Sequence, residues 1–211
     1  ALAFRGAQLL HAAQDWPACA AAFAAIAADP GAPHATEAAY GAALCQLGIY
    51  DAAHPGSDRA GLGVLPRGAA LEPEQLAARG FTATEQGWLD AIDAQRCALT
   101  VSPNAASRAH GSRLRFARAR TYLDAHRWAE AAAAFRELAR DPQAPDAAAA
   151  APLYLEAFYA ASQAAHPAHA CGATIAAEVD ALLAQHCAGG ARPAACAALT
   201  AIQADAATLP R

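Results

Sequence analysis

The spacing of apolar residues in the second half of the chain predicts a pair of antiparallel helices. The stretch from Arg113 to Pro145, RLRFARARTYLDAHRWAEAAAAFRELARDPQAP, has helical periodicity on both sides of a short break. The break at Ala125–His126–Arg127 predicts a tight turn, and Asp141–Pro142 predicts the end of the second helix. We therefore expect a helical hairpin over this stretch.

The same pattern occurs 112 positions earlier in the chain. Eight positions pair in this way: Phe4 with Phe116, Trp16 with Trp128, Phe23 with Phe135, Ile26 with Leu138, Asp29 with Asp141, Pro30 with Pro142, Ala32 with Ala144 and Pro33 with Pro145. Repeated helical hairpins are typical of stacked, solenoid-like proteins whose role is to bind other proteins.

Helix signals and breaks divide the chain into five parts. We expect a first hairpin with a following helix over 1–48, a long connection over 49–72, intervening helices over 73–102, a second hairpin with a following helix over 103–165, and a terminal hairpin over 166–211. Gly48 predicts the end of a helix that begins near His34. The connection is rich in Gly and Pro, and we favour an irregular surface loop over a binding loop.

Two further signals mark helix starts in the intervening part. Thr82 with Glu85 predicts a capping box, and Pro73 predicts a short helix that runs to Arg79. Ser102–Pro103 predicts the start of the long helix of the second hairpin.

Composition supports an all-α fold and excludes some partners. Alanine, a strong helix former, makes up 70 of the 211 residues, and no stretch alternates with the period of a strand. The net charge of −4 argues against a general nucleic-acid binder, and no apolar run is long enough to span a membrane. The sequence begins at Ala1 without a leader, so we expect a mature product or a fragment of a longer chain.

The six cysteines suggest disulfides. Cys187 and Cys196 lie at similar distances from the turn between their predicted helices, and so do Cys19 and Cys45, because antiparallel helices bring such positions level. We expect these two pairs to be bonded, which implies a periplasmic or extracellular location. Cys97 and Cys171 remain, as a long-range pair or as free thiols.

The hairpin sequence resembles a tetratricopeptide repeat. That family has an aromatic residue late in its first helix, another after the turn, a small residue, a further aromatic and a closing Asp-Pro. Tyr122, Trp128, Ala131, Phe135 and Asp141–Pro142 occupy these places in one copy, and Leu10, Trp16, Cys19, Phe23 and Asp29–Pro30 occupy them in the other. The cysteine-rich tail with its closing Leu–Thr–Ala–Ile–Gln is also similar to large exported tetratricopeptide proteins of GC-rich bacteria.

The resemblance implies a binding groove lined by the first helix of each hairpin. On that pattern Arg113, Phe116, Arg120 and Asp124 face the groove, where guanidinium groups bind carboxylates of a protein or peptide partner. The alternative, which we favour, is a solvated helix face whose arginines pair with neighbouring helices.

The leading interpretation is a non-enzymatic protein–protein interaction or scaffold module, which binds a peptide segment or packs as a subunit of a larger assembly, with no cofactor and no metal. The alternative is a metal- or thiol-dependent enzyme built on a late cluster: His166, His169, Cys171, His186, Cys187 and Cys196. The spacing of these residues matches no compact zinc motif, and no catalytic motif occurs elsewhere.

Overall fold

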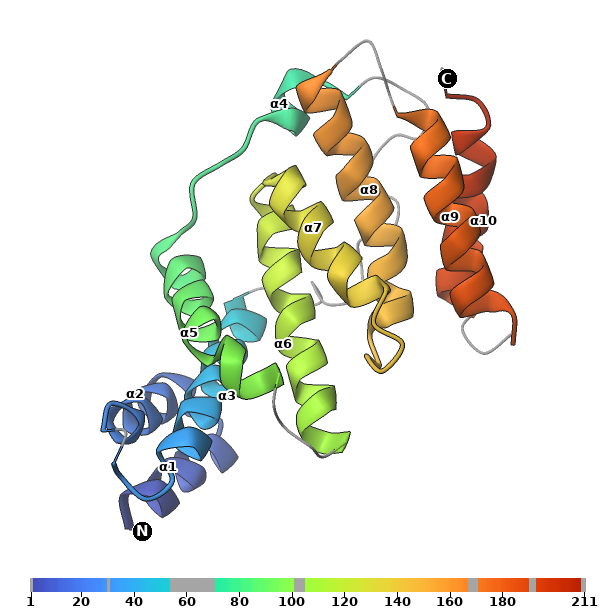
Figure 1. The fold of residues 1–211 in the computed structure, drawn as a ribbon. Coiled ribbons are helices and arrows are strands. Elements are labelled where there is room, and N and C mark those ends of the chain that lie inside the picture. The colour runs from blue at the N-terminus through green and yellow to red at the C-terminus, as the bar shows by residue number, and fades with distance from the viewer. Residues whose placement is uncertain are drawn as a thin grey trace. The chain divides into compact units, whose positions relative to one another are not determined.

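The computed structural model describes residues 2–29, 31–53, 71–100, 105–166, 171–189 and 193–209. These residues form ten α-helices and contain no β-strand, which confirms the all-α prediction for them (Figure 1). The helices are α1 (Leu2–Ala12), α2 (Trp16–Ala27), α3 (Ala35–Ala53), α4 (Pro73–Leu76), α5 (Ala83–Thr100), α6 (Ala105–Asp124), α7 (Trp128–Ala139), α8 (Ala147–Ala165), α9 (Gly172–Cys187) and α10 (Pro193–Ala206).

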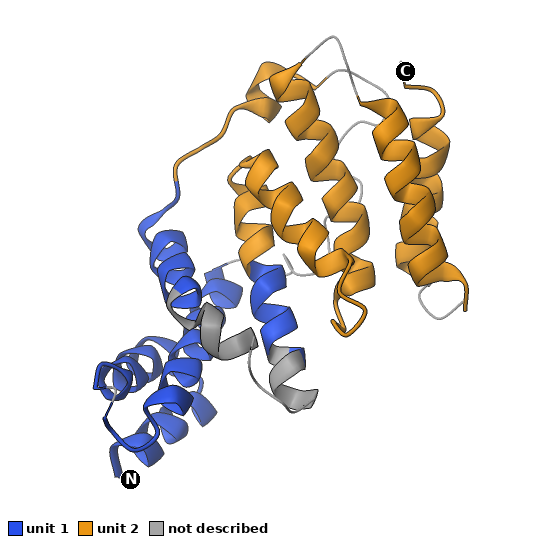
Figure 2. Cartoon of the chain, viewed as in Figure 1, with its two compact units in different colours: residues 1–58, 81–117 blue, residues 59–80, 118–211 orange. Residues whose placement is uncertain are grey.

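The chain divides into two compact units (Figure 2). Unit 1 contains residues 1–58 and 81–117, and unit 2 contains residues 59–80 and 118–211. In unit 1, α3 packs against α1, α2 and α5. In unit 2, α8 packs against α4, α7, α9 and α10. Each unit therefore has a helix that several others contact.

The local geometry of α1–α3 recurs 112 residues later. The bounds of α2 and α7 differ by this offset, and so do those of α3 and α8. The turn before each second helix contains a left-handed residue, Gln14 with φ 58° and His126 with φ 53°. The turn hydrogen bonds also recur: Gln14 N–H donates to His11 O and His126 N–H to Leu123 O, while Asp15 N–H donates to Leu10 O and Arg127 N–H to Tyr122 O.

Two glycines allow α2 to approach α3 closely. A Cβ at Gly41 would lie 2.8 Å from the Phe23 ring, and a Cβ at Gly48 would overlap the Trp16 ring. Trp16 and Phe23 are seven residues apart, and so are Gly41 and Gly48, so each large ring of α2 faces a position of α3 without a side chain. The first hairpin therefore depends on glycine for its packing.

This packing corrects the predicted end of the third helix. Gly48 does not end the helix, because α3 continues to Ala53 and residues 49–53 are helical rather than part of a loop. The sequence alone does not distinguish a glycine that ends a helix from a glycine that packs against a large aromatic ring. Residues 54–70 of the predicted connection lie outside the described residues, as does the predicted helix start at Ser102–Pro103.

The start of α5 confirms one capping prediction, and α4 corrects another boundary. Thr82 N–H donates to Glu85 Oε2 at 2.8 Å, and Glu85 N–H donates to Thr82 Oγ1 at 3.2 Å, as a capping box requires. The helix that begins at Pro73 ends at Leu76 rather than at Arg79. Its continuation is prevented by an extended Ala77, with φ −69° and ψ 120°, and by the pairing of Arg79 N–H with Ala125 O.

The aromatic residues of both hairpins contribute to packing. Phe23, Phe135 and Trp128 are buried, whereas Trp16 is half-buried. Phe23 contacts the Phe4 ring edge-on, with 5.5 Å between the centroids. These contacts hold the first helix of the hairpin against the second.

Candidate interaction surface

The four residues predicted to line a groove have different surroundings in the structure. Arg113 is exposed and forms an ion pair with Asp51 of α3, with 2.8 Å between Nη2 and Oδ2. Phe116 is buried, so its ring is covered. Arg120 Nε lies 2.8 Å from Asp124 Oδ1, and these two side chains are only 14% and 23% exposed. The Arg113 pair fits the alternative of arginines that bind neighbouring helices, and a partner-binding role for the four residues stays a prediction.

Both predicted cysteine pairs lie at disulfide distance. Cys19 and Cys45 are joined with 5.8 Å between their Cα atoms, and Cys187 and Cys196 with 5.7 Å. The first pair is fully buried between α2 and α3. The second pair joins the end of α9 to α10 within the C-terminal helical hairpin. Antiparallel helices bring these residues level, as the sequence predicts.

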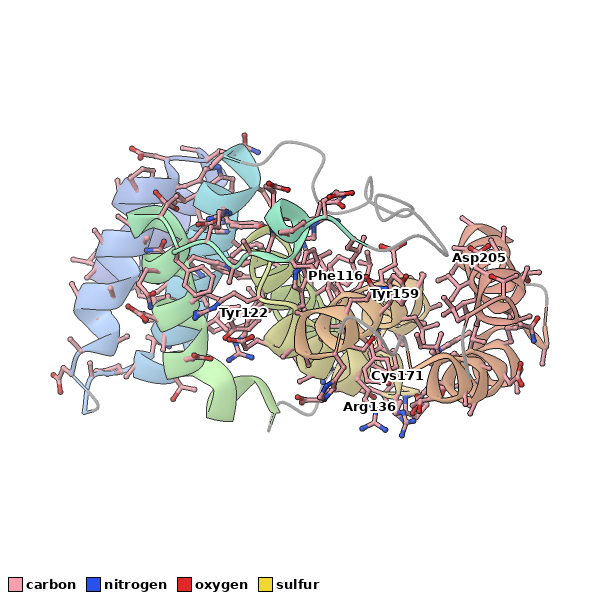
Figure 3. The ribbon with its side chains drawn as sticks, turned by 90° about the horizontal axis from the view of Figure 1, so that it is seen from above. Phe116, Tyr122, Arg136, Tyr159, Cys171 and Asp205 are labelled. Atoms are coloured by element: carbon pink, nitrogen blue, oxygen red, sulfur yellow. A yellow bond between two sulfur atoms is a disulfide. The ribbon has the colours of Figure 1, made fainter. Side chains whose placement is uncertain are left out.

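The late histidines and cysteines do not gather at one point in the described residues. Cys187 and Cys196 are bonded to each other, and Cys171, labelled in Figure 3, is an exposed free thiol. His186 Nε2 lies 2.9 Å from Ala139 O, and His166 is exposed. His169 and the side chain of Cys97 lie outside the described part of the chain. Within that part, no three His, Cys, Asp or Glu side chains form a group that could hold a metal.

A polar cluster, which the sequence analysis missed, joins α9 to α7. Arg140 Nη2 lies 2.7 Å from both carboxylate oxygens of Glu178, and Arg136 Nη2 lies 3.2 Å from one of them (Arg136 is labelled in Figure 3). Glu178 is 13% exposed. Burial works to raise the pKa of Glu178, but the hydrogen bonds and charges of Arg140 and Arg136 outweigh it, so the pKa lies below its ordinary value.

The cluster extends to α8 through Tyr154. Burial raises the pKa of Tyr154, and the charge of Glu178 with its hydrogen bond to the hydroxyl raises that pKa further. At the end of α9, Gln185 Nε2 donates to Ala139 O at 3.2 Å, beside the contact from His186. These polar groups bind the last turn of α7 to α9, which is a structural role.

A second polar contact fixes the segment that precedes α5. Leu71 N–H donates to Gln163 Oε1 at 2.9 Å, and Gln163 Nε2 donates to the Tyr159 hydroxyl at 2.8 Å (Tyr159 is labelled in Figure 3). Burial raises the pKa of Tyr159, although the bond from Gln163 works against it. Arg79 N–H donates to Ala125 O at 3.0 Å further along the segment. Residues 71–79 therefore lie against α8 and the turn after α6.

One apolar face is exposed. Leu2 and Leu9 of α1 are 89% and 68% exposed, and they are the large apolar side chains of the described residues that solvent reaches most. Their seven-residue spacing places them on the same face of the helix. The seven-residue spacing of the two leucines is visible in the sequence, but such a spacing is as typical of a buried helix face as of an exposed one.

Comparisons with known proteins assign neither a family nor a function to this chain. No protein-family model matches the sequence, and searches of curated proteins and of solved structures found no match. In the part of the chain that the structure describes, no helix combines the length and the apolar character that crossing a bilayer requires.

Proposed function

We propose that this chain is a non-enzymatic protein–protein interaction or scaffold module of tetratricopeptide-like helical hairpins. The observation that carries the proposal is the recurrence of helix bounds, turn conformation and turn hydrogen bonds at one offset of 112 residues. Duplicated helical hairpins extend by stacking and present helix faces to partners, which suits a scaffold better than a single catalytic centre.

The disulfides support a location for this module. Cys19–Cys45 and Cys187–Cys196 persist in oxidising compartments, which favours a periplasmic or extracellular protein associated with the cell envelope. In this proposal the module binds a protein or peptide segment, or packs as a subunit of a larger complex. Nothing in this proposal requires a nucleic acid, a metal or a cofactor.

The polar groups of unit 2 support a structural role over a chemical one. Glu178, Gln163 and His186 each contact another helix or segment of unit 2. Cys187 and Cys196, two of the three cysteines of the late cluster, are bonded to each other. A metal- or thiol-dependent enzyme is the competing function.

Thiol titration with metal analysis distinguishes the two functions. We expect the denatured, unreduced protein to show at most two free thiols of its six cysteines, since two pairs are bonded, and no stoichiometric metal. Stoichiometric zinc with four or more free thiols would instead favour the enzyme.

Photo-crosslinking in the producing cell tests for a partner. A photo-reactive residue is placed at Leu9 of α1, at Ala133 of α7 and at Ala181 of α9, all of them exposed. An interaction module forms a discrete crosslink to another polypeptide from at least one of these faces. The absence of a crosslink from all three, with intact disulfides, contradicts the proposal.

A further inference from the structure

The two disulfides differ in how far solvent reaches them. Cys19 and Cys45 are fully buried between α2 and α3, with exposed fractions of 0%. Cys187 and Cys196 are half-buried, and the residue that follows each of them in the chain is exposed. A reductant therefore reaches the second bond in the folded protein, whereas it reaches the first only after the α2–α3 pair opens locally.

The half-buried bond holds a helix that has few other anchors. The helix α10 packs on α9 and α8. Four described side chains of α10 are buried and apolar, and two of them are alanines: Ala195, Leu199, Ile202 and Ala206. Gln203 Nε2 donates to Asp180 Oδ1 of α9 at 2.5 Å, and both side chains are exposed. Apart from the disulfide, the packing of this 14-residue helix therefore depends mainly on two large side chains.

The α2–α3 pair has more than its disulfide to hold it. Phe23 is buried, and the rings of Phe23 and Trp16 lie directly against Gly41 and Gly48. The contact between Phe23 and Phe4 adds a ring from α1. The buried disulfide is therefore one part of an extensive apolar interface, and it serves as the internal reference for the exposed one.

We propose that Cys187–Cys196 is a redox-sensitive switch, which ties α10 to α9 when it is oxidised and loosens α10 when a dithiol reductant cleaves it. Exposed disulfides are typically the labile and regulatory ones, whereas buried disulfides resist reduction. Loosening exposes Leu199 and Ile202 to solvent, together with the apolar surface that they cover. This inference goes beyond the interaction-module function and does not depend on it, because it concerns the attachment of one helix.

The cleavage is a thiol–disulfide exchange in two steps. A thiolate of the reductant attacks the sulfur of Cys187, forms a mixed disulfide with it and releases Cys196 as a thiolate. The second thiol of the reductant then attacks its own sulfur in the mixed disulfide, which releases Cys187 and leaves the reductant as an internal disulfide. Two electrons and two protons pass from the dithiol to the protein, which ends with two thiols.

The positions of the two sulfurs in their helices determine the direction of the attack. Cys187 is the last residue of α9, and Cys196 lies in the first turn of α10, which begins at Pro193. The partial positive charge at a helix N-terminus stabilises a thiolate, and the partial negative charge at a C-terminus destabilises one. Cys196 is therefore the better leaving group, and the attack falls on Cys187.

Graded reduction of the native protein tests the selectivity. The protein is incubated with dithiothreitol or with reduced thioredoxin, free thiols are alkylated at intervals, and the fragments are mapped. Cys171, an exposed free thiol, reports complete alkylation from the start. We expect Cys187 and Cys196 to be reduced roughly tenfold faster or more than Cys19 and Cys45, because the buried bond requires local opening. Equal rates, or earlier reduction of Cys19–Cys45, contradict the switch.

Hydrogen exchange measures the loosening of α10. Reduction of Cys187–Cys196 should speed amide exchange in α10 by roughly tenfold or more, while α7 keeps its protection. The double variant Cys187→Ala, Cys196→Ala should exchange like the reduced protein, and its α10 should not respond to dithiothreitol. The matched control Cys19→Ala, Cys45→Ala should retain the response of α10. Unchanged exchange in α10 after complete reduction of Cys187–Cys196 overturns the inference.

Trapping of the mixed disulfide tests the direction of the attack. A thioredoxin whose second active-site cysteine is replaced by serine cannot complete the exchange and stays bonded to the sulfur that it attacks. Mass spectrometry of the trapped complex should locate this bond at Cys187. Capture at Cys196 alone contradicts the assigned leaving group, and the absence of any captured complex contradicts cleavage by a protein dithiol.

Discussion

The helix bounds of the α2–α3 pair of unit 1 and of the α7–α8 pair of unit 2 differ by a constant 112 residues, but the two pairs are held together differently. Cys19 and Cys45 form a buried disulfide in the first pair, whereas the equivalent Ala131 and Ala157 in the second are fully buried alanines. Small side chains at these positions let the helix axes approach closely. The hairpin therefore accommodates either a disulfide or two packed alanines at these equivalent positions.

The two pairs also differ in what surrounds them. In the first pair, α3 accommodates the rings of α2 over Gly41 and Gly48, whereas in the second pair α7 contacts Glu178 of α9 through the polar cluster. The α7–α8 pair thus combines buried alanines with a polar cluster to α9, where the α2–α3 pair combines glycines with a disulfide. Two hairpins with the same spacing of helix bounds are therefore held together by different side chains.

The largest expected effect is the loss of a buried ring. Phe135→Ala removes a fully buried side chain from α7 and should lower the free energy of unfolding by about 3–5 kcal/mol. Phe23→Ala, at the equivalent place in the first hairpin, should cost a similar amount. Denaturant unfolding by circular dichroism measures both. A loss near zero for either would mean that the two rings are not equivalent and that the alignment of the hairpins is accidental.

The next effect concerns the disulfide itself. The double variant Cys19→Ala, Cys45→Ala gives the first pair the alanines of the second, so the cross-link and its two buried sulfur atoms are lost. The chain-entropy argument gives about 3.5 kcal/mol for a loop of this length and somewhat under 3 kcal/mol for Cys187–Cys196. The converse variant, Ala131→Cys with Ala157→Cys, should form a disulfide under oxidising conditions. Failure of this new bond to form would show that the two pairs are not geometrically equivalent.

A smaller effect separates the two uses of glycine. Gly48→Ala places a methyl group into the Trp16 ring and should destabilise the first hairpin by about 1–3 kcal/mol, despite the better helix propensity of alanine. Gly87 of α5 is the matched control, because a Cβ there meets nothing within 4 Å. Gly87→Ala should stabilise by about 0.5–1 kcal/mol. Thermal unfolding of both variants checks the sign, and a stabilising Gly48→Ala would remove the close-packing account.

The smallest effect depends on pH. Glu178→Gln should cost about 1–2 kcal/mol near neutral pH, because it removes a largely buried, charge-assisted partner of Arg136 and Arg140. The pKa of Glu178 lies lower in the folded protein, so its contribution is present above the ordinary glutamate pKa and is lost as the pH falls through the folded value. The difference between wild type and variant should therefore shrink on acidification.

The matched control for that pair is exposed. Glu130→Gln breaks the surface pair with Arg127, whose side chains are 49% and 40% exposed, and should change stability by well under 1 kcal/mol. Unfolding midpoints from about pH 3 to 7 measure both variants. A Glu178→Gln deficit that does not change with pH would contradict the assigned cause.

Local signals in the sequence predicted most helices and both disulfides. The capping box at Thr82 and the turn before α7 follow from neighbouring residues, and the cysteine pairs follow from equal distances to a turn. The polar cluster does not follow from neighbouring residues, because Glu178 contacts Arg140 only where α9 packs within unit 2. The predicted helix end at Gly48 was wrong because glycine is favoured both at helix ends and where two helices pack closely.

The exposed face of α1 shows the same limit. Leu2 and Leu9 have the spacing of a buried stripe, and only the structure shows that solvent reaches them. The groove role of Arg113, Phe116, Arg120 and Asp124 stays a prediction, although the structure shows that Phe116 is covered and that Arg120 pairs with Asp124. Periodicity predicts that a face is apolar, but burial depends on which other segment packs there.

The most direct test of the central claim, that oxidised disulfides hold the hairpins of an interaction module, is peptide mapping of the protein from its native source. The protein is alkylated without reduction and cut before aspartates. The account predicts that fragment 15–28, with Cys19, stays linked to fragment 29–50, with Cys45. It also predicts that fragment 180–204, with Cys187 and Cys196, carries no alkyl group. Recovery of all four cysteines as alkylated thiols would contradict the disulfides and the location inferred from them.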